Sequence, residues 1–242
     1  MTRILAIDTS TAWCSVALSS GEPAPLLRHE LVSAGASQLV LPWVEALLQE
    51  SHLQLKDLDA IAIGIGPGAF TGVRLGVAVV QGLAIASDLA VLPIASLDAI
   101  AAQCIKTSTF EKIKPKYFVI AIDARMDEIY WAKYEAPTQT HQMAKRMGGI
   151  HLSKPDDLDL TNIEFLAGSA LRVYGERLFS KATASLLQIG LDPEIQLSAL
   201  GILDCARQML MAGGQRHVRE LEPLYVRDKV ALTTQERQEV VK

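Results

Sequence analysis

The sequence, 242 residues long, has few residues that bind metals or form disulfides. Its three cysteines are scattered and odd in number, and no two of its five histidines are four residues apart. Disulfide frameworks and zinc sites depend on such spacings. We therefore expect no disulfide, no metal and no resident cofactor in this chain.

An excess of positive charge is also absent. The chain has 23 Lys and Arg against 27 Asp and Glu, a net charge of −4. Because independent nucleic-acid binding usually needs a basic face, we expect contact with nucleic acid only through a complex. The N-terminus leads directly into an apolar strand, Arg3–Asp8, with no signal peptide, and no apolar segment is long and unbroken enough to span a membrane. These absences predict a cytoplasmic protein.

What the sequence does have is a glycine-rich stretch, Gly64-Ile-Gly-Pro-Gly-Ala-Phe-Thr-Gly-Val-Arg-Leu-Gly76. An apolar run over residues 60–65 leads into it and predicts a buried strand, and a helical run over about 71–87 follows it. Glycines in such a turn permit backbone angles that are closed to other residues. The pattern is therefore strand, tight turn, helix.

The start of that helix offers free N–H groups, which can hold an anion. Thr71 is placed to cap the helix. The candidate anion or nucleotide contacts are Gly66, Gly68, Thr71 and Arg74. No Lys follows the last glycine of the turn, as a Walker loop would require, so a tight turn without a ligand is an equally weighted alternative.

Apolar residues cover more than one face of two predicted helices, over about 37–50 and 71–87, and the second has almost no polar face. A helix that is apolar all round is buried all round, and an exposed apolar face of that size is a liability on a monomer. We therefore predict that both helices pack against a second chain. The residues predicted to line that interface are Leu39, Trp43, Leu47, Val73, Val77, Val80 and Ala84.

The other elements are predicted from alternation, caps and turn residues. The predicted strands cover residues 13–18, 26–31, 90–94, 117–123 and about 221–226, and a further strand contains Trp131. The predicted helices cover 97–105, where Ser96 is the expected cap, 171–180 and 200–212. The polar residues 107–116 are predicted to link a first lobe, 1–106, to a second, smaller lobe, 117–242, whose charged end is expected to fray.

The second half of the chain repeats the order of elements of the first. Ala-Ile-Asp occurs at 6–8 and again at 121–123, each time followed by a polar turn and a strand that contains a Trp. The run at 163–170 also resembles the strand and turn at 60–68. We infer an internal duplication of a βββαβα unit.

Such a duplication, with an Asp after each first strand, is similar to the actin, Hsp70 and sugar-kinase fold, where two turns clamp nucleotide phosphates. The clamp needs glycine so that the backbone approaches phosphate closely. Here Ser10 and Arg125 stand where glycine is wanted. We therefore expect Asp8 and Asp123 to cap strand ends, Arg125 to be a surface residue, and the chain to lack ATPase activity.

Three stretches together resemble the TsaB (YeaZ) family: the opening Ile-Asp-Thr-Ser, the glycine-rich stretch 66–76, and Asp-Ala-Arg-Met-Asp-Glu-Ile-Tyr-Trp at 123–131. The resemblance spans nearly the whole chain. It implies an α/β protein of duplicated actin-like (ribonuclease H-like) units in two lobes. It further implies a non-catalytic partner of TsaD in making N6-threonylcarbamoyladenosine at position 37 of tRNAs that read codons starting with A.

The same resemblance implies TsaE as a further component, tRNA contact only through the complex, and pairing with TsaD, or with a second copy, through the first-lobe helices. TsaD carries paired metal-binding histidines on the helix after the third strand, and residues 36–43 here contain none. ADP or ATP at the interface of the complex stays an open alternative.

Two other functions compete with this scaffold interpretation. A small-molecule kinase of the actin-like fold needs two glycine-containing clamps, which the turns at Ser10 and Arg125 disfavour. A dinucleotide-binding protein needs an acidic residue at the end of the next strand, and that strand ends in Pro93-Ile94. The sequence favours the scaffold.

Overall fold

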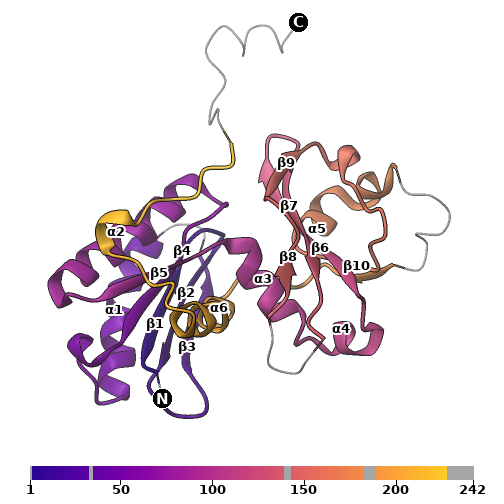
Figure 1. Cartoon of the computed structure of the whole chain (residues 1–242). Coiled ribbons are helices and arrows are strands. Elements are labelled where there is room, and N and C mark those ends of the chain that lie inside the picture. The colour runs from indigo at the N-terminus through magenta and orange to yellow at the C-terminus, as the bar shows by residue number, and fades with distance from the viewer. Residues whose placement is uncertain (1, 33–34, 139–142, 182–188, 228–242) are drawn as a thin grey trace, which may run out of the picture.

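In the computed structural model, which describes residues 2–32, 35–138, 143–181 and 189–227, the chain forms two lobes, each built around one mixed sheet. Figure 1 shows the lobes side by side, with helix α3, Ser96–Cys104, between them. This is the two-lobed actin-like α/β fold that the duplicated pattern predicts.

The first sheet has the order β3-β2-β1-β4-β5. Strands β1 to β3 are antiparallel neighbours, and β4 and β5 run parallel to β1. Its strands are β1 Ile4–Asp8, β2 Trp13–Ser19, β3 Leu26–Leu31, β4 Ala60–Gly64 and β5 Ala90–Ile94.

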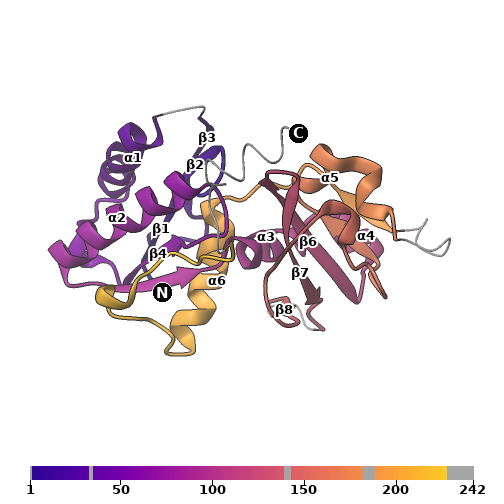
Figure 2. The same cartoon turned by 90° about the horizontal axis from the view of Figure 1, so that it is seen from above.

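Helices cover both faces of this sheet, so its central strands are apolar throughout. Helices α1 (Ala36–Glu50) and α2 (Phe70–Ser87) pack on one face, against residues such as Ile61 and Ile63. Helices α3 and α6 (Ala199–Met211) lie on the other face, as Figure 2 shows. The short 3-10 turn Leu55–Asp57 connects α1 to β4.

The second sheet repeats the order of the first. Strand β6 pairs with β7 on one side and β10 on the other; β11 lies beyond β10, and β8 and β9 pair with β7. Its strands are β6 Tyr117–Arg125, β7 Glu128–Glu135, β8 Lys145–Arg146, β9 His151–Ser153, β10 Phe165–Ala167 and β11 Gly190–Asp192. The order β7-β6-β10-β11 matches β2-β1-β4-β5, and the short strands β8 and β9 together take the place of β3, which confirms the predicted duplication.

The duplication extends to a side-chain pair that the sequence analysis did not identify. Trp13 on β2 stacks on His29 of β3 with ring centroids 4.4 Å apart, and Trp131 on β7 stacks on His151 of β9 at 4.7 Å. Cross-strand ring pairs of this kind stabilise sheets. Both histidines therefore lie on strands, and His151 is also exposed.

The predicted helix caps are wrong. Helix α2 begins after Ala69 and α3 after Ala95, and neither start has a side-chain cap. Thr71 lies inside the first turn of α2 and is exposed. Backbone carbonyls replace the caps, because the N–H of Ser96 donates to Gly66 O at 2.9 Å.

The predicted linker, 107–116, contains helix α4, Ser108–Ile113. The ring of Phe110 is buried 5.0 Å from Phe118 and 5.2 Å from Phe165. This part of the stretch is therefore packed into the second lobe. The stretch was predicted to be a linker because it is mostly polar, but the single buried ring of Phe110 is enough to hold so short a helix against the lobe.

Helix α6 comes from the second half of the sequence, yet it packs on the first sheet, where Ile202, Leu203 and Ala206 join the core. The predicted division assigns residues 117–242 to the second lobe, and this packing departs from it. The path from β11 to α6 is thus a second crossing between the lobes. Contacts this distant in sequence leave no local signal.

The end of the described chain is extended but unpaired. After the 3-10 turn Val218–Glu220, no strand forms over 221–226, so that prediction is wrong. Pro223 lacks the N–H that a ladder needs. Leu224 makes one bond to the first sheet, its N–H donating to Ile65 O at 2.8 Å. The predicted frayed tail lies outside the described residues.

The helical prediction for 171–180 is correct only in part. Helix α5, Ala170–Tyr174, is followed by 3-10 turns over Gly175–Phe179, and a further 3-10 turn covers Pro155–Asp157. Gly175, with φ +51°, ends α5.

Helix α2 is, among the described residues, the one helix long and apolar enough by length and composition to cross a membrane. By that criterion the expectation that it is too short is wrong. Its inward face is nevertheless packed in the first lobe.

Candidate functional site

The glycine-rich turn between β4 and α2 lies directly against the turn between β1 and β2. The N–H of Ala69 donates to Ser10 O at 2.6 Å, and Thr9 Oγ1 donates to Gly72 O at 2.7 Å. A Cβ on Gly68 would overlap Ser10 O, and one on Gly72 would overlap Thr9 O. The glycines therefore make room for protein backbone.

The four candidate anion contacts do not converge on one point. Gly66 is buried beside Val73, and Gly68 faces Ser10. Thr71 is exposed, and the Arg74 guanidinium lies 3.5 Å from the centroid of the Phe70 ring. Phosphate recognition needs several donors aimed at one place.

We predict that Gly72→Ala destabilises the fold by about 2 kcal/mol or more, because the added methyl group overpacks the contact with Thr9. The matched control is Gly82→Ala, in the same helix, where a Cβ has no neighbour within 4 Å. Removing an exposed helical glycine stabilises by about 0.5–1 kcal/mol. Urea denaturation of both variants measures the difference, and equal stabilities would contradict the packing role of Gly72.

Asp8 ends β1 as a fully buried carboxyl group. It accepts hydrogen bonds from Ser10 N at 3.2 Å and Ser10 Oγ at 2.8 Å, and Ser10 Oγ also lies 3.2 Å from Ser96 Oγ. A Cβ on Gly64 would overlap Asp8 Oδ1, so glycine is needed there. Burial raises the pKa of Asp8 to about 7, against the opposing hydrogen bonds from Ser10.

Asp123 caps the turn between β6 and β7. Its Oδ1 accepts from Arg125 N at 2.9 Å and from the Tyr174 hydroxyl at 2.8 Å. Desolvation first, and then the hydrogen bond to Asp123, raise the pKa of Tyr174 to about 12. Both carboxyl groups therefore bond to the turn that follows them, as expected for strand-end caps.

The phosphate clamp of the actin-like fold does not fit these residues. On the first lobe, the Ser10 carbonyl takes the Ala69 N–H at the place where backbone would face phosphate. On the second lobe, the turn presents an Arg side chain in place of glycine. The chain's own backbone thus fills the clamp, and we derive no nucleotide chemistry from it.

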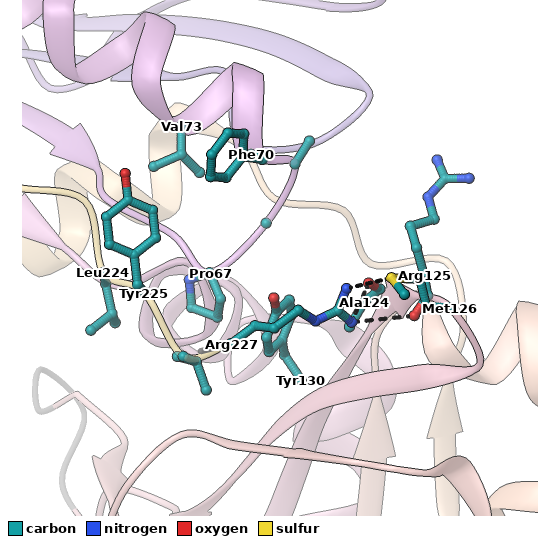
Figure 3. A pocket seen from close by; sticks show the side chains of 13 residues that line it. Pro67, Phe70, Val73, Ala124, Arg125, Met126, Tyr130, Leu224, Tyr225 and Arg227 are labelled. Carbon is teal, nitrogen blue, oxygen red and sulfur yellow. Dashed lines mark hydrogen bonds between the residues drawn. The ribbon is translucent and has the colours of Figure 1, made fainter. Parts of the chain in front are cut away.

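A pocket of about 260 Å³ remains between the lobes, and Figure 3 shows it from close by. Its walls come from the glycine-rich turn, the β6–β7 turn and the extended residues 224–227. The third wall was not predicted from the sequence, because residues 221–226 were assigned to a strand. The whole pocket is lined by Pro67, Gly68, Ala69, Phe70, Val73, Ala124, Arg125, Met126, Tyr130, Leu224, Tyr225, Val226 and Arg227.

Most of the predicted interface residues face inward. Five of the seven are at most 5% exposed and belong to the core between α1, α2 and the first sheet. They are Leu47, Val73, Val77, Val80 and Ala84. Leu39 and Trp43 are half-buried. The five buried side chains therefore belong to the core of the first lobe and not to its exposed helix faces.

The outward face of α2 is nevertheless apolar. It presents Ala78, Gly82 and Ala86 to solvent, with Ile85 at 70% exposure, and Leu41 of α1 is 50% exposed. The two helices therefore do have an uncovered apolar surface, but other residues form it than those predicted.

Among the described residues, no three His, Cys, Asp or Glu side chains are grouped as a metal site requires. The three cysteines are free thiols, and Cys14 and Cys104 are buried.

Comparison with known proteins finds one family model, described as TsaD, tRNA N6-adenosine threonylcarbamoyltransferase, over residues 30–231. The chain is 32% identical over 235 residues to the tRNA threonylcarbamoyladenosine biosynthesis protein TsaB of Escherichia coli K12, covering 95% of this chain and 96% of the relative. It is 44% identical over 131 residues to TsaB of Haemophilus influenzae, covering 54% and 52% of the two chains. The solved structure of YeaZ from Pseudomonas aeruginosa superposes with a TM-score of 0.78 at 32% identity, over 93% of this chain and all of that one.

Proposed function

The chain belongs to the TsaB (YeaZ) family, and from that premise we propose that it is a non-catalytic subunit that activates a TsaD-type transferase. Its product would be N6-threonylcarbamoyladenosine at position 37 of tRNAs that read codons starting with A. The E. coli relative's name places that protein in threonylcarbamoyladenosine biosynthesis.

The observation that carries the non-catalytic role is the hydrogen bond from Ala69 N to Ser10 O. It occupies the glycine-rich turn with the chain's own backbone. The two carboxyl groups nearest the clamp, Asp8 and Asp123, are bonded to their own turns. Neither has an arrangement in which it would position a nucleotide for phosphoryl transfer.

The exposed face of α2 supports the partnership. Ala78, Gly82 and Ile85, spaced four and three residues apart on α2, form an uncovered strip. Small residues let a second helix approach closely, and large exposed apolar areas usually mark an interface. We propose that TsaD covers this strip in the heterodimer and that a second copy covers it when the chain is alone.

The charge of the chain supports indirect contact with tRNA. With a net charge of −4, the chain is a poor ligand for phosphate backbones by itself. We propose that TsaD and TsaE supply the contacts to tRNA, and that the chain acts in the cytoplasm. It would bias TsaD toward its active arrangement by binding that arrangement more tightly.

Reconstitution with purified TsaD, TsaE, tRNA, threonylcarbamoyl-adenylate and ATP tests the proposal. Omission of this chain is expected to lower tRNA modification about 10-fold or more, within the usual range of coupling between binding partners. Asp8→Asn and Asp123→Asn are expected to restore it. Undiminished modification without the chain would end the scaffold proposal.

If the Asp variants pair with TsaD but fail to support modification, the carboxyl groups act in catalysis, and the alternative of an actin-like kinase or ATPase returns. Mass spectrometry of the native complex also reports whether ADP or ATP is held at the interface. A nucleotide that is lost when TsaD is removed belongs to the complex and not to this chain.

A further inference from the structure

We propose that the pocket between the two lobes binds a small anion carried on a flat apolar body, such as a carboxylate with an aromatic ring. This is a property of the chain alone and does not depend on pairing with TsaD. It differs from the phosphate clamp, which the Ser10 backbone fills.

The shape and the lining of the pocket indicate the size and the flatness of the apolar part of the ligand. Three rings, those of Phe70, Tyr130 and Tyr225, stand among its aliphatic walls. Small-molecule sites are concave, mostly apolar and furnished with a few polar groups, over about 300–1,000 Å³. At about 260 Å³ this pocket accommodates one ring with a short substituent.

The charge at the mouth sets the polar part. The lining contains two arginines and no acidic residue. Arg227 is paired, with Nη2 at 2.6 Å from Glu128 Oε2 and its side chain only 13% exposed. The Arg125 side chain is 87% exposed, and its Nε lies 3.6 Å from Asp123 Oδ2. One guanidinium is thus available at the mouth, and a carboxylate is its preferred planar partner.

The turn that carries Arg125 is strained. Arg125, Met126 and Asp127 have φ values of +62°, +56° and +58°, a left-handed conformation that non-glycine residues seldom adopt. Three such residues in succession are unfavourable, because each Cβ comes too close to the following carbonyl oxygen. Strain of this kind is concentrated at ligand-binding and active sites.

Surrounding side chains hold this turn in place. Arg177 binds Asp127 through both terminal nitrogens, at 2.6 and 3.2 Å. Arg227 Nη2 donates to Ala124 O at 3.0 Å. Figure 3 shows the Arg125 side chain extending from the fixed turn beside the pocket, clear of the other labelled side chains. These contacts hold the strained turn in the conformation that exposes the Arg125 guanidinium.

The first-lobe wall is also fixed before any ligand arrives. Arg74 stacks on Phe70, and its Nε donates to the Tyr225 hydroxyl at 2.9 Å. Leu224 is tied to Ile65 through its backbone. A preformed pocket loses less entropy on binding.

Titration of the full chain with 3-phenylpropionate, followed by NMR of labelled methyl groups, tests the proposal. We expect saturable shifts of the Met126, Val73 and Val226 methyl signals. A ligand of about 11 non-hydrogen atoms is expected to bind with a Kd of about 0.6–4 mM. The neutral analogue, 3-phenylpropionamide, is expected to bind about 5-fold more weakly or worse, because one charge-assisted hydrogen bond is lost.

Two variants separate charge from shape. Arg125→Gln is expected to remove the difference between acid and amide, whereas Arg219→Gln, at an exposed position outside the pocket, leaves it unchanged. Val226→Phe fills the pocket and is expected to abolish the shifts while the thermal midpoint stays within a few degrees.

Phenyl phosphate distinguishes the two sources of the anion. Tighter binding than that of 3-phenylpropionate identifies a phosphate monoester as the natural class, and weaker binding identifies a carboxylate. The absence of saturable shifts with either anion up to 20-fold above the expected Kd overturns the proposal. Equal binding of acid and amide to the unmodified chain also overturns it.

Discussion

Val77→Glu is expected to unfold the chain, although its neighbour Ala78→Glu leaves the fold intact. Val77 is 5% exposed and packs in the core between α2 and the first sheet. An unpaired carboxylate there costs several kcal/mol. Because domains of this kind are stable by only about 5–15 kcal/mol, most of the folding free energy is lost.

Ala78 follows Val77 on α2 but is exposed. A surface substitution of this kind changes stability by about 0.5 kcal/mol or less. If TsaD covers the outward face of α2, the new carboxylate becomes buried at the interface, and the affinity for TsaD falls about 10-fold or more. Circular dichroism measures folding of each variant, and titration calorimetry with TsaD measures pairing.

The two substitutions together separate the core from the interface. If the Ala78→Glu variant pairs with TsaD as tightly as the unmodified chain, the interface does not include this face of α2. Val77→Glu that stays folded and loses pairing would mean that α2 rotates or detaches in the complex. Light scattering of the isolated chain adds a further check, since the same Ala78→Glu variant is expected to be monomeric.

Most of the residues predicted for the interface lie on the buried side of their helices, and for α2 the reason lies in the composition of the helix. A helix with a polar side has a phase that the sequence reveals. Between Val73 and Ser87 the helix has one charged residue, so nothing in the sequence distinguishes Val80, which is fully buried, from Ile85, which is 70% exposed. Only the position of the sheet determines which side of α2 is buried.

Strands and their order were predictable for a different reason. Each strand of the first sheet is a short apolar run between turn residues, and the shared Ala-Ile-Asp of the two halves marks equivalent first strands. The register confirms that equivalence, since Asp8 pairs with Ser15 on β2 and Asp123 with Ile129 on β7. Local pattern and internal repetition were sufficient here.

The candidate site depended on contacts that no local pattern contains. The glycines of the 66–76 stretch suggested an anion, but the group they accommodate is the Thr9–Ser10 backbone, about 60 residues away in sequence. The wall formed by Tyr225 and Arg227 comes from about 150 and 100 residues away from its partners Arg74 and Ala124. The strained Arg125 turn left one trace in the sequence, namely a tight hairpin without glycine.

Asp8 is expected to make the protein less stable at pH 8 than at pH 5, by about 3 kcal/mol from this group alone. Its pKa is about 7 in the folded chain and near its ordinary value of 3.8 when unfolded. Between these values the folded state holds a proton that the unfolded state has released. The stabilisation is therefore complete below about pH 4 and is lost as the pH rises through 7.

Two variants isolate this contribution from the other titrating groups. Asp8→Asn keeps an acceptor for Ser10 but carries no proton, so its stability lacks the decline between pH 4 and 7 and exceeds that of the unmodified chain at pH 8. Ser10→Ala removes both the side-chain bond that lowers the Asp8 pKa and the link to Ser96. It is expected to extend the decline above pH 7. Urea titrations at half-unit pH intervals measure all three slopes, and parallel curves for the unmodified chain and Asp8→Asn would show that Asp8 is ionised in the folded protein throughout.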